Sequence, residues 1–268
     1  MEEERRAAGP APAGHVVVVG NLKGGSGKST LVINLAGALA STGRRIAILD
    51  CDPQGTSSSW ARRGNGGIPV RFEPLRNLNG AGGWMVTAGE LRRDVDVLLV
   101  DLPGVVAPAM GAAFLIASLI LIPTGPHMVD IEGTRRVLAH LAKARAERAQ
   151  SPPPALLVPV RVRDLERGLV RWEELLEPLG LPMTPPLRQQ LEFDRAFEAG
   201  LWVGERFPDG AAHREVMAIG ERVLAELKTV APPPAFSTRR PAPSPDLSPI
   251  PPRPAPPQRS WWRRVLGA

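Results

Sequence analysis

Near its start the chain carries one glycine-rich run, Asn21-Leu22-Lys23-Gly24-Gly25-Ser26-Gly27-Lys28-Ser29-Thr30. An apolar, strand-like stretch (16–19) precedes it and a helical pattern (31–36) follows it, which is the context of a phosphate-binding loop. In such loops the backbone N–H groups surround phosphate oxygens, and the helix N-terminus adds favourable partial charge. The general pattern places Lys28 on the β- and γ-phosphates and the Ser29 hydroxyl on Mg²⁺. The predicted cofactor-binding residues are Gly24, Gly25, Ser26, Gly27, Lys28, Ser29 and Thr30.

This loop departs from the common pattern G-x-x-x-x-G-K-[ST], which requires glycine where Leu22 stands. It carries a second lysine, Lys23, just before the double glycine. The form K-G-G-x-G-K-[ST] resembles the deviant phosphate loop of the ParA/MinD family of ATPases. The resemblance implies ATP and Mg²⁺ as cofactors and a homodimer that forms with ATP. It also implies that Lys23 crosses the dimer interface to the nucleotide of the second protomer.

An acidic segment, Asp50-Cys51-Asp52-Pro53-Gln54-Gly55, follows the second strand-like run. Acidic residues at the carboxyl end of such a strand lie beside the phosphate loop, where Mg²⁺ and the attacking water are held. In the ParA/MinD family this D-x-D-P-Q-G text is the first switch. The resemblance implies that Asp52 orients the hydrolytic water and that Asp50 lies near the metal.

A second acidic signal is the segment Val97-Leu98-Leu99-Val100-Asp101-Leu102-Pro103-Gly104. Four apolar residues that end in an aspartate form the Walker B arrangement, in which a buried strand delivers one carboxylate to the water shell of Mg²⁺. Asp101 is therefore predicted to serve the metal together with Ser29. Pro103 and Gly104 are predicted to form the second switch, whose backbone senses the γ-phosphate.

The resemblance continues, with less specific text, through residues 121–124 and 130–133 and through residues 186–190 and 193–200. In small ParA proteins similar text lies near the adenine pocket and the dimer face. The resemblance covers about residues 15–228, and it assigns no individual catalytic role to these later segments.

Strand-like runs alternate with helical patterns along the chain. The runs are 16–20, 46–50, 95–101, 119–123 and 156–160, and the helical patterns are 28–42, 131–150, 165–177 and 212–228. Nearly continuous apolar strands between helices predict an α/β fold with a mostly parallel sheet and helices on both faces. The longest apolar stretch, 112–123, predicts the end of a buried helix followed by a buried strand rather than a membrane span.

Composition divides the chain into four predicted parts: a flexible lead (1–14), a ParA-like ATPase domain (15–230), a proline-rich linker (231–258) and a basic–aromatic segment (259–268). The formal net charge is +6, and residues 231–268 supply most of it, because they hold six arginines and one acid. A DNA-binding face on the domain must therefore come from clustered charges.

The ParA resemblance implies non-specific DNA binding in the ATP state. The candidate residues are Arg135, Arg136, Lys143, Arg145, Arg148, Arg161, Arg163, Arg167 and Arg171. The alternative is a solvated helix face, because Glu132 and Glu147 lie close by in the sequence. No room precedes Val16 for a helix-turn-helix domain, so we expect no sequence-specific operator binding.

The last segment places Trp261, Trp262, Val265 and Leu266 on one arc of a helix, with arginines off that arc. Such a segment can lie at a membrane interface, and MinD-type relatives use a C-terminal amphipathic helix in this way. Docking on a partner protein or on the domain itself is an equal alternative, and contact with DNA through the arginines is a third.

Residue counts narrow the function. The single cysteine, Cys51, excludes a disulfide framework and a cysteine-built metal cluster within one chain, and the absence of tyrosine argues against a tyrosine-autophosphorylating kinase. The N-terminus lacks an apolar signal core, so we expect a cytoplasmic, nucleoid-associated protein with peripheral membrane contact as an option.

We therefore expect an ATP-driven switch for plasmid or chromosome partition or for another cargo, stimulated by a ParB-like or other partner. A MinD-like membrane-cycling ATPase is the alternative. An amide-forming or biotin-pathway ligase remains open.

Overall fold

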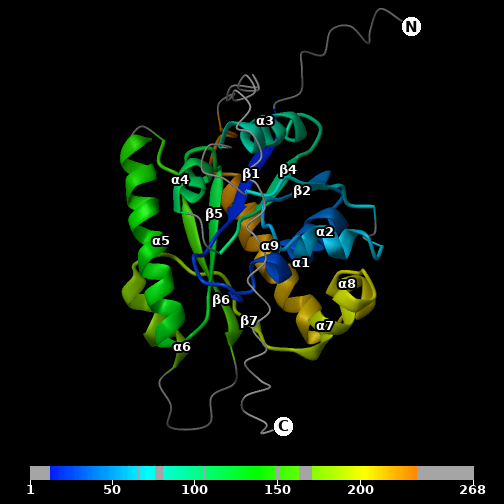
Figure 1. Ribbon diagram of the computed structural model, residues 1–268. Helices are drawn as coiled ribbons and strands as arrows, with labels where there is room; N and C mark the ends of the chain where they lie inside the picture. Colours follow the sequence, from blue (N-terminus) through cyan, green and yellow to red (C-terminus); the bar gives the residue numbers. More distant parts are fainter. Residues whose placement is uncertain are drawn as a thin grey trace, which may run out of the picture.

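The structure, a computed structural model, describes residues 13–64, 67–75, 81–104, 107–148, 151–162 and 171–233. Its centre is a parallel sheet of seven strands in the order β3-β2-β4-β1-β5-β6-β7 (Figure 1). The strands are β1 (His15–Val19), β2 (Ile46–Asp50), β3 (Val70–Phe72), β4 (Val97–Asp101), β5 (Leu119–Thr124), β6 (Ala155–Val162) and β7 (Leu187–Arg188).

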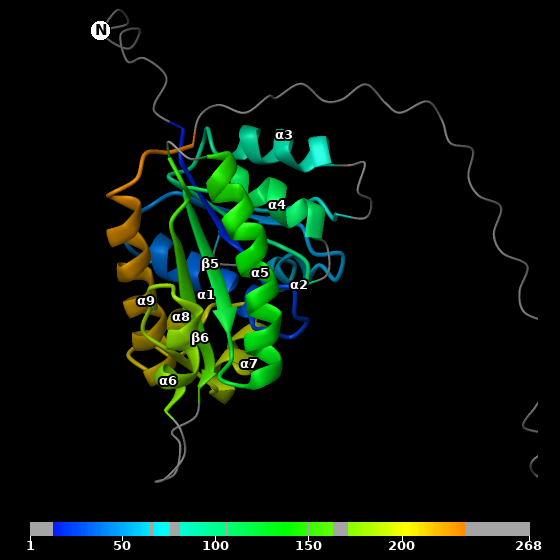
Figure 2. The ribbon, with the colours of Figure 1, turned by 90° about the vertical axis from the view of Figure 1, so that its left-hand side faces the viewer.

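Helices cover both faces of the sheet, as Figure 2 shows for α1 and α9 on one side and α4 and α5 on the other. The first layer holds α1 (Lys28–Ser41), α2 (Thr56–Ala61), α7 (Leu191–Glu198), α8 (Val203–Arg206) and α9 (Ala211–Leu227). The second layer holds α3 (Ala81–Leu91), α4 (Ala107–Leu115), α5 (Met128–Glu147) and α6 (Trp172–Leu176), which a short 3₁₀ turn, η3 (Glu177–Leu179), follows.

The strand sequences explain the two layers. Side chains alternate between the two faces of a strand, and in β1 Val17 and Val19 pack in the α1 layer while Val16 and Val18 pack in the α5 layer. Both sets are fully buried, so the strand reads as a continuous apolar run rather than an alternating one. The predicted fold class is confirmed.

All five predicted strands and the helices α1, α5 and α9 are present, with ends shifted by a few residues. Helix α5 begins at Met128, three residues before its predicted start, and β4 begins at Val97 rather than at residue 95. The stretch 112–123 is the end of α4 followed by β5, as predicted. Within the predicted helix 165–177, residues 165–170 lie outside the described part, and α6 covers only its end.

Most of the predicted lead (1–14), most of the proline-rich linker (231–258) and the whole basic–aromatic segment (259–268) also lie outside the described residues. The division of the chain into these four parts therefore stays a prediction. Across the described ranges, no helix combines the length and the apolar character needed to cross a membrane.

Because the strands are parallel, their carboxyl ends lie at one edge of the sheet, which we name the carboxyl edge; the opposite end is the amino edge. β1 lies at the centre, with β4 on one side and β5 on the other. Ligands of open α/β sheets bind outside the carboxyl ends of the strands, where the strand order reverses. The loop between β1 and α1 lies at that position.

Candidate nucleotide-binding site

The loop between β1 and α1 folds around two glycines with positive φ. Gly25 has φ 69° and Gly27 has φ 81°, a conformation that glycine adopts without steric cost. Gly27 is the N-cap of α1, and no side chain caps this helix. The first N–H groups of α1 therefore point toward the loop, where an anion can accept their hydrogen bonds.

A cavity of about 530 Å³ opens at this loop, which is within the usual size range of small-molecule sites. The phosphate loop and both predicted switches line it together: Leu22, Gly24, Gly25, Ser26, Gly27, Lys28, Ser29, Thr30, Asp52, Pro53, Gln54, Thr56, Pro103 and Gly104. The second switch comes so close that a Cβ on Gly104 would lie 3.2 Å from the Gly24 nitrogen. Three segments far apart in the sequence thus form one site.

Lys28 is the buried cation of this cavity, with 6% of its surface exposed. Its Nζ donates to the Lys23 carbonyl oxygen at 3.2 Å and to Ser26 Oγ at 3.5 Å. Burial lowers the pKa of Lys28, and the charges of Asp101 and Asp52 partly oppose that shift. A buried ammonium held by neutral oxygens is arranged to receive an anion such as a phosphate.

Two carboxylates lie side by side behind the loop, because Asp50 on β2 and Asp101 on β4 are paired in the sheet register. Ser58 donates to Asp50 Oδ2 through its backbone nitrogen at 2.8 Å and through its hydroxyl at 2.7 Å. Ser57 donates its hydroxyl to Asp101 Oδ2 at 2.8 Å. The first turns of α2 thus fix both acids.

The electrostatics of Asp101 indicate a site for a cation. Burial, followed by the neighbouring charge of Asp50, raises the pKa of Asp101 to about 7, while Ser29, Ser57 and Lys28 oppose the shift. Its Oδ1 atom is buried without a hydrogen-bond partner. A hydrated Mg²⁺ beside the Ser29 hydroxyl fits this oxygen, because Mg²⁺ prefers oxygen ligands and usually takes only one or two carboxylates besides phosphates and water. In the described ranges no group of three or more His, Cys, Asp or Glu side chains could hold a metal ion alone.

Asp50 and Asp52 differ in placement. Burial raises the pKa of Asp50, and its oxygens accept from Ser58 and from the Asp52 nitrogen, so it shapes the first switch as well as flanking Asp101. Asp52 lines the cavity and is half-buried, whereas Asp50 is fully buried. Its Oδ1 accepts from the Gln54 nitrogen at 2.9 Å, which orients the carboxylate.

A family comparison bears on this arrangement. The model of the CobQ/CobB/MinD/ParA nucleotide binding domain matches residues 17–201. The chain belongs to this family. The resemblance read from the loop and switch motifs is therefore confirmed.

Individual relatives of this ParA/MinD-type chain differ in how much of it they match. Protein ParA of Rhizobium radiobacter is 36% identical over 117 residues, which cover 43% of this chain and 50% of the relative. Maintenance of carboxysome distribution protein A of Halothiobacillus neapolitanus is 26% identical over 222 residues, covering 79% and 95%. The chain thus spans about half the length of the first relative and nearly all of the second.

The solved structure of MinD complexed with Mg-ADP from Pyrococcus horikoshii has the same fold. It superposes with a TM-score of 0.62 at 17% identity, covering 80% of this chain and 98% of that one.

The extra lysine of this ParA/MinD-type loop does not line the cavity. Lys23 lies at its rim and pairs with Asp130 in the first turn of α5. Asn21 fixes the loop in this position, since its Oδ1 accepts from the Lys23 nitrogen at 3.1 Å and its Nδ2 donates to the Pro123 oxygen at 2.8 Å and to Thr134 Oγ1 at 3.1 Å. No sequence pattern predicts the contacts of Asn21, Ser57 and Ser58, and those of Asn21 and Ser57 join segments that lie far apart in the chain.

A second cavity of about 200 Å³ adjoins the first and shares Thr30 and Thr56 with it. It is lined mainly by Ile33, Asn34, Phe193, Asp194, Phe197 and Leu201. Residues 193–200, for which the ParA resemblance implied a position near the adenine pocket, thus lie beside the phosphate loop.

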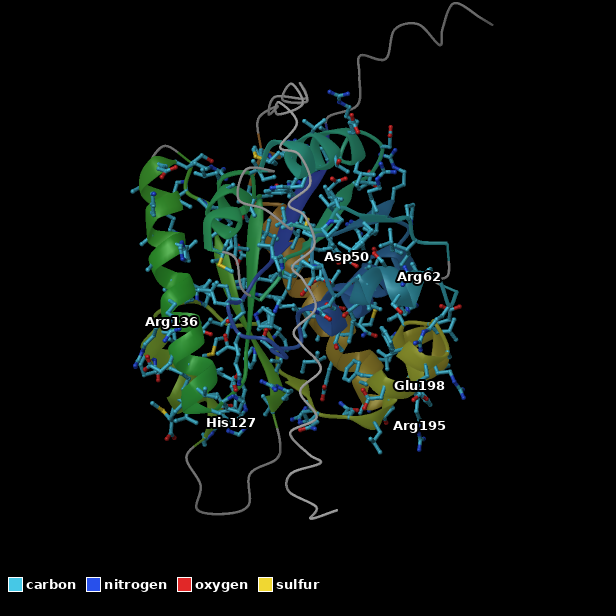
Figure 3. The ribbon with its side chains drawn as sticks, in the orientation of Figure 1. Asp50, Arg62, His127, Arg136, Arg195 and Glu198 are labelled. Atoms are coloured by element: carbon cyan, nitrogen blue, oxygen red, sulfur yellow. The ribbon has the colours of Figure 1, made fainter. Side chains whose placement is uncertain are left out.

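Fewer of the predicted basic residues are available to contact DNA than the sequence indicates. Arg148 Nη1 donates to the Ala117 oxygen at 2.7 Å and to the Leu115 oxygen at 3.2 Å, and Arg145 Nε donates to the Pro153 oxygen at 3.2 Å, so both fix neighbouring loops. Arg161 pairs with Asp130, and positions 163 and 167 lie outside the described residues. Arg135, Arg136, Lys143 and Arg171 are exposed, but three of them pair with nearby acids: Arg135 with Glu132, Lys143 with Glu147 and Arg171 with Glu173. Figure 3 shows Arg136 on the outer side of α5.

Proposed function

We propose that this chain binds ATP with Mg²⁺ at the carboxyl edge, dimerises in that state, and hydrolyses ATP slowly until a partner stimulates it. Through this cycle it positions DNA, as in plasmid or chromosome partition, or another cargo. Membership in the family, and relatives named for ParA function and carboxysome distribution, support a positioning ATPase.

The proposal gives roles to the backbone of the phosphate loop and to four side chains at the carboxyl edge. The loop N–H groups and Lys28 bind the β- and γ-phosphates, Ser29 and Asp101 hold the Mg²⁺ ion and its waters, and Asp52 orients the attacking water. Bound Mg²⁺ would neutralise charge on the phosphate oxygens. The adjoining cavity between Ile33 and Phe193 receives the base.

The observation that carries the proposal is that the two lysines of the phosphate loop occupy different positions. Lys28 lies inside the cavity, whereas Lys23 lies outside it on the rim, where it can serve a second protomer. The exposed large apolar side chains of the described residues lie at or after the carboxyl ends of strands: Phe72 ends β3, Met128 and Val129 follow β5, and Leu191 follows β7. Met128 and Val129 are neighbours in the first turn of α5, beside the partner of Lys23, and adjacent exposed apolar groups favour a protein contact.

The test is the mass of the protein in solution with Mg²⁺ and a non-hydrolysable ATP analogue. The unsubstituted chain should become a dimer, while Lys23→Ala should bind the analogue as a monomer. Lys143→Ala, which removes an exposed lysine of α5, is the matched control and should dimerise normally. An unaltered dimer population in Lys23→Ala would contradict the role of Lys23 across the interface.

DNA binding rests on the exposed bases of α5. Arg135 and Arg136 should contact phosphates of a duplex of any sequence, so binding should require ATP and weaken steeply with salt. Fluorescence anisotropy with a random duplex should show weaker binding for Arg135→Ala/Arg136→Ala. Binding that ignores both the nucleotide and this substitution would point to a cargo other than DNA.

The second candidate, a membrane-cycling ATPase, rests on the tryptophans of the segment 259–268, which lies outside the described residues. Arg92 Nη2 donates to the Pro233 oxygen at 2.7 Å, so a truncation that keeps Pro233 leaves the domain intact. Co-sedimentation with anionic liposomes and ATP should then be lost on truncation after Pro233. Equal sedimentation of both chains, or none by either, would remove this candidate.

A further inference from the structure

Asp130 on α5 is a buried carboxylate that the proposed chemistry does not use. Its side chain is 1% exposed, and it lies in the first turn of α5, where the helix N-terminus favours a negative charge. Its Oδ1 atom accepts from Lys23 Nζ and, at 3.0 Å, from Arg161 Nη2. One carboxylate therefore has two cations, which come from the phosphate loop and from β6.

The surroundings are shaped for this cluster. A Cβ on Gly125 would lie 2.6 Å from Asp130 Oδ2 and 3.2 Å from Arg161 Nη2, so only glycine leaves room for the pair. Arg161 has φ 55° and lies at an irregularity in the pairing of β6 with β7. Left-handed backbone at an arginine is uncommon and costs free energy, and here it accompanies a guanidinium aimed at Asp130.

The two cations are not equivalent. Removing the only partner of a buried charge is strongly destabilising, but Asp130 keeps Arg161 when Lys23 leaves. Lys23 can therefore exchange between Asp130 in its own protomer and a phosphate of another protomer without leaving an uncompensated carboxylate. Arg161 remains in place as the permanent counter-ion.

We propose that Asp130 is a positioning residue that holds Lys23 within its own protomer before ATP-driven dimerisation, with Arg161 as the counter-ion that permits its release. This rests on the proposed role of Lys23 in a dimer. Two substitutions then act in opposite directions. Asp130→Asn removes the attraction and frees Lys23, whereas Arg161→Gln leaves Lys23 as the remaining cation of the pair and holds it more firmly.

The first measurement uses the nucleotide-free chain and is independent of any ATPase cycle. Trace acetylation followed by mass spectrometry compares Lys23 with Lys143, an exposed lysine in the same molecule. Lys23 should react at least several-fold more slowly than Lys143. Asp130→Asn should raise the Lys23 rate several-fold, and Arg161→Gln should lower it. Equal rates at Lys23 in the unsubstituted chain and in Asp130→Asn would overturn the proposal.

The second measurement is the protein concentration at half-dimerisation with Mg²⁺ and the ATP analogue. Asp130→Asn should lower it about tenfold and Arg161→Gln should raise it. Glu147→Gln, which changes an exposed acid at the opposite end of α5, is the matched control and should leave it unchanged. A merely structural role would move both variants in the same direction, and that result, or no shift, overturns the proposal. If neither the unsubstituted chain nor any variant dimerises, the proposed function is wrong. The acetylation rates then still test whether Asp130 holds Lys23.

Discussion

The two edges of the sheet hold similar residues in opposite electrostatic settings. At the amino edge, Arg45 and Asp96 form an exposed pair with Nη2 and Oδ1 2.7 Å apart, which raises the pKa of Arg45 and lowers that of Asp96. At the carboxyl edge, burial moves the pKa of Lys28 down and that of Asp101 up. Groups whose charged forms are disfavoured without a ligand mark functional sites. At the amino edge the two charges compensate each other within the chain. At the carboxyl edge a bound phosphate and cation would compensate Lys28 and Asp101.

The largest predicted effect is the loss of ATP affinity after a substitution at the carboxyl edge. Lys28→Ala should weaken binding of ATP with Mg²⁺ at least about 100-fold, equivalent to about 2.7 kcal/mol, because the phosphates lose a charge-assisted hydrogen bond. Titration calorimetry measures this directly. The domain should still unfold cooperatively near its usual temperature, since the removed cation is buried at a cost. Affinity within threefold of the unsubstituted chain would refute the assigned role.

A medium effect should follow from Asp101→Asn in the nucleotide-free protein. Between the unfolded pKa of 3.8 and the folded value of about 7, the native state binds a proton that the unfolded state does not. The stability that Asp101 contributes is therefore full below about pH 3.8 and is lost as the pH rises to about 7. Between pH 4 and pH 8 the free energy of unfolding of Asp101→Asn should rise by more than about 1 kcal/mol relative to that of the unsubstituted chain, because one pKa unit corresponds to about 1.4 kcal/mol.

Urea unfolding at several pH values measures this gap. Asp96→Asn at the amino edge is the control. The pKa of Asp96 is lowered in the folded state, so any loss on substitution should be the same at pH 5 and pH 8. If the difference in free energy of unfolding between Asp101→Asn and the unsubstituted chain does not grow with pH, the pKa of Asp101 is not raised in the folded state.

The smallest effect should come from Arg45→Ala. Its guanidinium is exposed, and exposed ion pairs contribute little to stability. The urea midpoint should shift only slightly, and the affinity for ATP should stay within twofold. A change in nucleotide affinity would mean that the two edges are coupled and would blur the distinction between them.

The sequence predicts the parts of the site that are local in the chain. The glycine-rich loop, Asp52 and Asp101 stand at fixed places next to apolar strands, so spacing alone locates them. The partners that hold them do not: Asp101 meets Ser57 and Lys23 meets Asp130, residues 44 and 107 positions apart, and only the packed sheet brings them together.

The sequence patterns do not predict β3, β7, α2, α3, α7 and α8, and they overestimate the basic patch. β3 and β7 have three and two residues, too few for a period to show. α2 is mostly serine and threonine, a composition that does not distinguish a helix from a loop. Arg148 reads as a surface charge in the sequence, but its guanidinium holds the loop between α4 and β5.

Hydrogen exchange with Mg²⁺ and a non-hydrolysable ATP analogue tests most directly the claim that the carboxyl edge is an ATP-gated dimer face. We predict slower exchange at residues 21–30, 52–56 and 102–104, and at 126–133 only with the ATP analogue and not with ADP. Residues 44–46 and 92–96 at the amino edge should exchange at unchanged rates. Protection that is equal at the two edges, or that is absent at 126–133 with the ATP analogue, would contradict the claim.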